Sequence, residues 1–139
     1  MKVIDGTDLI LGRLATKVAK AAIAGEQIVV VNCEEVVVTG KRDVVFAKYK
    51  KTANRTTMLK GPRIHRGADR LVRRTIRGMI PYKTATGKEA FQRVMCYVGV
   101  PPEVSKEKIE TFEDINIHNT ENMQFVKMKE VSKVLGAKI

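Results

Sequence analysis

One helix with two dissimilar faces constrains how this chain folds. Residues 67–81 read GADRLVRRTIRGMIP, and at about 100° per residue one face collects Ala68, Leu71, Val72, Thr75, Ile76 and Met79. The opposite face carries Arg70, Arg73, Arg74 and Arg77. We expect the helix to stop before Pro81, because proline disfavours helical geometry in the residue that precedes it. The apolar face then anchors to a core, and the arginine face stays outside it.

The arginine face favours an external polyanion. Like charges three and four residues apart on a helix repel one another, and the only acid among these residues is Asp69, in the first turn, where it complements the helix dipole. The planar guanidinium group also donates two parallel hydrogen bonds to phosphate. We therefore interpret the helix as a nucleic-acid-binding element; the alternative is an ordinary solvated helix.

Positive charge is concentrated in the middle of the chain. The 139 residues carry a formal net charge of +11, from 26 Lys and Arg and 15 Asp and Glu. Residues 1–40 hold 4 basic and 5 acidic residues, residues 41–100 hold 16 and 3, and residues 101–139 hold 6 and 7. The central segment is thus at +13 between two ends at −1 each. This distribution predicts an acidic partner for the central segment.

The segments around the arginine helix predict an α/β fold. Ile28–Val31 is apolar at every position, which is typical of a strand buried on both faces. Leu11–Ala24 has helical periodicity, and Gly25 suits the left-handed residue that closes a helix. Further strand-like runs lie at 2–6, 36–38 and 95–98, and helix-like runs at 41–49, 88–93 and 128–135. We expect a three-layer α/β/α fold with a small, mostly parallel central sheet and a basic loop–helix extension.

The length favours one domain over residues 1–139. We expect residues 1–50 and 88–100 to form the sheet core and residues 51–81 to form a basic loop and the arginine helix. Residues 103–139 are then a C-terminal segment that packs on the core. The basic loop has no acid and no apolar periodicity, so it is either a solvated linker or a loop that becomes ordered on RNA.

The residue types needed for catalysis or metal binding are sparse and scattered. His65 and His118 are the only histidines, and neither has partners at metal-ligand spacing. Cys33 and Cys96 lie in apolar sequence, and we interpret them as buried, reduced thiols rather than a disulfide. The glycines after the first strand lack the spacing of a dinucleotide site. We expect no metal, no cofactor, no small-molecule substrate and no enzymatic activity; a nucleotide-dependent enzyme acting on RNA is the alternative.

Membrane attachment is not expected. No apolar run approaches the roughly 18 residues that a membrane span requires. The N-terminus leads directly into a strand-like segment, so we expect no signal peptide and a cytoplasmic protein.

Two motifs resemble a known family. Val3–Lys20, VIDGTDLILGRLATKVAK, joins a strand to a helix that opens with LGRLAT. Ile76–Gly99, IRGMIPYKTATGKEAFQRVMCYVG, contains an Arg-Gly-Met-Ile-Pro core, a later Gly-Lys pair and a strand that ends in glycine. With Val29–Gly40, which also fits, these segments resemble the universal ribosomal protein L-thirteen family of the large subunit. Residues 55–66 and the tail after Pro102 look like its archaeal and eukaryotic branch.

The resemblance implies a three-layer α/β fold, a place in the large ribosomal subunit, and contacts with its 23S-type rRNA and with neighbouring ribosomal proteins. The expected function is that of a structural constituent that binds and fixes rRNA in subunit assembly and translation. A protein–protein adaptor that docks through the neutral C-terminal third is a further alternative.

The candidate RNA-binding residues are mostly cations of the central segment. Aromatic residues make up only 5% of the chain, so charge must dominate the binding rather than base stacking. The expected RNA-contacting residues are Arg13, Lys17, Lys41, Arg42, Arg55, Lys60, Arg63, His65, Arg66, Arg70, Arg73, Arg74, Arg77, Lys83 and Lys88.

Overall fold

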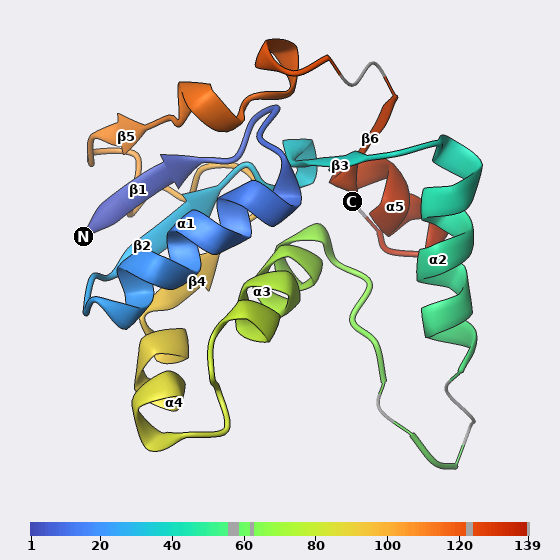
Figure 1. The fold of residues 1–139 in the computed structure, drawn as a ribbon, viewed down its shortest axis with the longest axis horizontal. Helices are drawn as coiled ribbons and strands as arrows, with labels where there is room; N and C mark the ends of the chain where they lie inside the picture. Colours follow the sequence, from blue (N-terminus) through green and yellow to red (C-terminus); the bar gives the residue numbers. More distant parts are fainter. Residues whose placement is uncertain (56–58, 62, 122–123, 139) are drawn as a thin grey trace.

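The computed structural model describes residues 1–55, 59–61, 63–121 and 124–138. Its central element is a four-stranded sheet in the order β4-β2-β1-β5 (Figure 1). The strands are β1 (Lys2–Asp5), β2 (Ile28–Val31), β4 (Val94–Cys96) and β5 (Ile109–Glu110). All three pairings in this sheet are parallel, which confirms the predicted α/β class and parallel sheet.

The two faces of the sheet are covered differently. Ile4, Ile28 and Val30 face a core shared with helix α1 (Leu11–Ile23), which crosses the sheet in Figure 1. The opposite face of the sheet presents the alternating residues Val3, Val29 and Val31, which pack on Val104. Val104 belongs to a run of turns at 102–106, so the layer on this face is a short turn segment rather than a helix. All of β2 is buried between the two layers, as its uniformly apolar sequence predicts.

A second, smaller sheet lies beside the first. Strand β3 (Val37–Thr39) pairs antiparallel with β6 (Phe125–Lys127), and not with the parallel sheet as its sequence suggested. The reason lies just before β3, where Asn32 adopts a left-handed conformation and the 3₁₀ turn η1 (Cys33–Glu35) turns the chain away from β2. The partner β6 comes from the tail, whose pattern is too weak to predict a strand.

Four further helices complete the described fold, and they are α2 (Arg42–Asn54), α3 (Ala68–Met79), α4 (Ala85–Gln92) and α5 (Met128–Val134). Helix α3 stops before Pro81, and Gly25 closes α1 with φ +102°, both as predicted. Helix α2 continues past its predicted end at Tyr49, since the Lys and Ala residues that follow favour helix. The predicted basic loop therefore begins near Arg55; its residues 56–58 and 62 lie outside the described part.

The shape of the turn between α3 and α4 depends on one glycine. Thr84 caps α4: its Oγ accepts a hydrogen bond from the Gly87 N–H at 3.1 Å and donates one to the Pro81 carbonyl at 2.8 Å. This brings Gly87 against the Pro81 carbonyl, where an added Cβ would lie 2.0 Å from the oxygen. The steric contact thus explains why the Gly-Lys pair of the second motif has glycine at position 87.

Among the described residues, no helix combines the length and the apolar composition needed to cross a membrane.

Replacing Gly87 with Ala is expected to lower the free energy of unfolding by about 2–3 kcal/mol, because overpacking against rigid backbone cannot relax. Gly78→Ala is the matched control, since an added Cβ there meets nothing within 4 Å and alanine favours helix. Urea denaturation of both variants measures the difference. Equal stability of the two variants would contradict this account of the turn.

Candidate nucleic-acid interface

Helix α3 is anchored by its apolar face. Ala68, Leu71, Val72 and Ile76 are buried in the main core, and the helix packs mainly on α1. The predicted apolar face is shorter at its C-terminal end, where Met79 is exposed and touches Thr16 of α1. This anchoring fixes the direction in which the arginines point.

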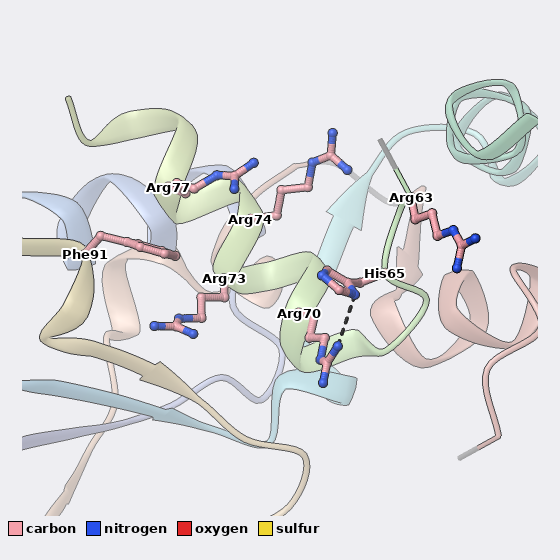
Figure 2. Close-up of a pocket in the computed structure, with 7 residues that line it drawn as sticks. All are labelled: Arg63, His65, Arg70, Arg73, Arg74, Arg77 and Phe91. Atoms are coloured by element: carbon pink, nitrogen blue, oxygen red, sulfur yellow. Dashed lines mark hydrogen bonds between the residues drawn. The ribbon is translucent and has the colours of Figure 1, made fainter. Parts of the chain in front are cut away.

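Six cationic or ionisable side chains line one concave surface beside α3. Figure 2 shows four arginines of α3 together with Arg63 and His65, which come from the segment before the helix, and Phe91 of α4. We call this surface the basic hollow; its lining residues are Arg63, His65, Arg70, Arg73, Arg74, Arg77 and Phe91, and it encloses about 450 Å³. Among the described residues, none that line it is acidic.

The arginines of the hollow are held to different degrees. Arg73 is half-buried: its Nε donates to the Val94 carbonyl at 3.1 Å, and its guanidinium lies 4.6 Å from the centre of the Phe91 ring. Arg77 is also half-buried and lies 5.0 Å from the centre of the Tyr82 ring. The arginine face is therefore not uniformly open, and Arg73 also supports the fold, which its place on the helical wheel did not predict.

The remaining arginines of α3 are exposed. Arg70 donates to Nδ1 of His65 at 3.1 Å, and a guanidinium can only donate, so this nitrogen of His65 carries no proton. The other ring nitrogen of His65 can then donate to a ligand. Arg74 is exposed at the middle of the row and makes no hydrogen bond or ion pair within the described part of the chain. Arg70 and Arg74 are the two most accessible anion donors of the helix.

The ion pairs of the described residues lie away from the arginine row. They join Lys17 to Asp114, Arg42 to Glu130, Arg93 to Glu89, Lys2 to Glu26, and Lys127 to Asp8 and Glu35. None of these pairs includes an arginine of α3. The positive charge of the basic hollow is therefore uncompensated within the described structure, as an anion-binding surface requires.

Lys17, Arg42 and Arg66 were also predicted to contact RNA, but each lies against another part of the protein, outside the basic hollow. Lys17 donates a hydrogen bond to Asp114 Oδ1 at 2.6 Å, and this bond holds the pKa of Asp114 below its ordinary value. The ammonium group of Lys17 also lies over the Phe112 ring. Arg42 lies 2.9 Å from Glu130. The guanidinium of Arg66 lies near Gly136, at the end of α5, and is not part of the basic hollow. These contacts separate the three residues from the arginine row.

The other predicted residues are exposed but spread over several elements. They are Arg13 on α1, Lys41 and Arg55 at the two ends of α2, Lys60 in the segment that follows, and Lys83 and Lys88 around the start of α4. The structure thus brings together six of the fifteen predicted residues in one hollow, and the other nine lie outside it.

Sequence reasoning missed Phe91 as a site residue. Phe91 follows no aromatic pattern in the sequence, and its position near Arg73 results from the turn that leads from α3 into α4 and from the packing of α4 on α1. The cysteines are buried and unpaired, and the neighbouring Cys96 together with burial raises the pKa of the Cys33 thiol, which makes it unreactive. Within the described ranges, no cluster of three or more His, Cys, Asp or Glu side chains is arranged to hold a metal ion.

Comparisons with known proteins agree on one family. The family model described as ribosomal protein L13 matches residues 1–103. A "Large ribosomal subunit protein uL13" of Natronomonas pharaonis is 43% identical over 137 residues, covering 99% of this chain and 92% of its own. Proteins of the same name from Methanocaldococcus jannaschii and Methanosarcina barkeri are 42% and 40% identical and are covered over 99% of both chains. All three organisms are archaea, and the similarity to these relatives includes the tail beyond residue 103.

The contacts of Arg73 lead to a prediction about stability. Arg73→Ala is expected to lower the free energy of unfolding by about 1–2 kcal/mol, because it removes a hydrogen bond and a contact with Phe91. Arg74→Ala, which removes the same side chain from the exposed face, should change it by less than about 0.5 kcal/mol. Thermal or urea denaturation of the two variants measures the difference. If the two variants unfold alike, Arg73 has no structural role.

Proposed function

Because the chain belongs to the ribosomal protein L13 family, we propose that it is a structural constituent of the large ribosomal subunit that binds and fixes rRNA through the basic hollow. The family consists of structural proteins, and the chain is not an enzyme. A place in the large subunit also makes neighbouring ribosomal proteins its partners and the cytoplasm its location. In this role the chain acts in subunit assembly and translation.

The observation that carries the proposal is that Arg63, Arg70, Arg74 and their neighbours line one surface, with no acid among its described lining residues. Arginine binds phosphate through paired, charge-assisted hydrogen bonds. Four of these arginines, Arg70, Arg73, Arg74 and Arg77, come from one helix, so their backbone positions are fixed before the RNA binds. This lowers the entropy cost of binding.

Phosphates are the natural ligands of this array. The major groove of an RNA helix is too deep and narrow for side chains to read, so proteins recognise paired RNA by its shape and backbone. The basic hollow offers guanidinium donors along one helix and a single aromatic ring, which suits backbone contacts better than base reading. The exposed cations outside the hollow, such as Arg13, Lys41 and Lys88, extend the proposed surface over α1, α2 and α4.

The salt dependence of binding tests this function. The affinity for a fragment of large-subunit rRNA should fall linearly with salt on logarithmic axes, with a slope of about 0.7–0.9 for each phosphate neutralised. Arg70→Ala and Arg74→Ala should each lower the slope by somewhat less than one, since each removes one phosphate contact. Filter binding over a series of salt concentrations measures the slope.

Lys108→Ala is the control for this measurement. Lys108 is exposed next to β5, at the opposite edge of the sheet from β4. Its removal should leave the slope unchanged, although it lowers the net charge by the same amount as each arginine variant. Unchanged slopes in both arginine variants, with a reduced slope in Lys108→Ala, would place the RNA-binding surface elsewhere and refute the proposal.

A further inference from the structure

A second concave surface lies between α2 and α3. Its lining comes from three parts of the chain: Lys48, Tyr49 and Thr52 of α2, Ile64 of the segment between the helices, and Leu71, Arg74, Thr75 and Gly78 of α3. We call it the interhelical hollow. It encloses about 270 Å³, less than the roughly 300–1,000 Å³ of clefts that hold drug-sized molecules. This size suits a single planar ring system.

The interhelical hollow combines apolar walls with cations. Tyr49, Ile64 and Leu71 supply apolar surface, and each is at least partly buried in the main core. Lys48 and Arg74 are exposed cations on opposite helices. Among the described residues that line the hollow, none is acidic. A ligand with a flat apolar body and a negative charge beside it matches this arrangement, as a nucleotide does.

Two threonines supply hydrogen-bond acceptors to the walls of the interhelical hollow. Thr52 Oγ donates to the Lys48 carbonyl at 2.9 Å, and Thr75 Oγ donates to the Leu71 carbonyl at 3.1 Å. Each hydroxyl proton is thereby used within its own helix, and the oxygen keeps lone pairs that accept hydrogen bonds. The walls therefore favour a ring that carries N–H donors, such as the exocyclic amino group of adenine.

Arg74 connects this surface with the basic hollow, because it lines both. An RNA strand held by the arginines of α3 thus passes the rim of the interhelical hollow. We propose that the interhelical hollow binds one unpaired base of the RNA, stacked against Tyr49, while Lys48 and Arg74 contact the phosphates on either side of it. The inference rests on the proposed RNA-binding function and adds that the protein selects RNA with an extruded nucleotide.

Gly78 allows the hollow to be filled without removing any charge. It lies exposed in the last turn of α3, and an added Cβ there meets nothing within 4 Å. Leucine at this position extends into the hollow, and its higher helix propensity favours the fold. Gly12→Leu is the matched control, since Gly12 lies in the first turn of α1 and is equally open.

The experiment compares two RNA hairpins that differ in one base. The first carries a single bulged adenosine, and the second carries an abasic residue at the same position, so the backbone charges are equal. The unchanged protein is expected to bind the first hairpin at least about fivefold more tightly, the lower range for stacking one base on an aromatic side chain. Gly78→Leu should bind both hairpins with the affinity that the unchanged protein has for the abasic one. Gly12→Leu should retain the preference.

The outcomes separate the inference from the proposed function. Equal, salt-dependent binding of both hairpins by the unchanged protein would overturn the inference and leave the proposed function standing. A preference that persists in Gly78→Leu would place the base elsewhere and overturn the inference as well. If neither hairpin nor the rRNA fragment binds in a salt-dependent manner, the proposed function itself fails.

Discussion

The packing of α3 determines where the charge of this protein lies. Four pairs of arginines stand three or four residues apart on this helix, and each pair costs about 0.2–0.5 kcal/mol through repulsion. The buried face opposes this cost: Leu71, Val72 and Ile76 each contribute roughly 1.5–3 kcal/mol by leaving water. The apolar contacts outweigh the repulsion severalfold, so the helix keeps its shape without neutralising its charges. An arginine array that needs no internal acid stays available for phosphate.

The distribution of acids follows the same logic. Asp114, Glu130 and Glu35 come from parts of the chain that are neutral overall, and they pair with Lys17, Arg42 and Lys127. These pairs lie at or near the surface and add little stability individually, but they neutralise cations away from α3. The positive field is then strongest where the fold has left the arginines unpaired. This explains how a net charge of +11 becomes a localised surface rather than a diffuse one.

Local patterns in the sequence predicted the elements better than their arrangement. The apolar run of β2, the two faces of α3 and the closing role of Gly25 depend on nearby residues, and all three are confirmed. The partner of β3 was not predicted, because this strand pairs with residues almost ninety positions away. The basic hollow shows the same limit: the arginine row is a local pattern, whereas the contact of Arg73 with Phe91 exists only in the folded protein, where residues of α3 and α4 meet.

The C-terminal tail was the least readable part of the sequence, yet both hollows depend on its contacts. Its strand β6 pairs with β3, directly before α2, and its helix α5 packs on α2 and α3. Ser132 of α5 donates to the Arg66 carbonyl and so holds the segment that carries Ile64 and His65. The tail therefore sets the separation of α2 and α3 without lining either hollow. Its near-neutral charge suits this role, because a basic tail would add repulsion to the two helices it holds together.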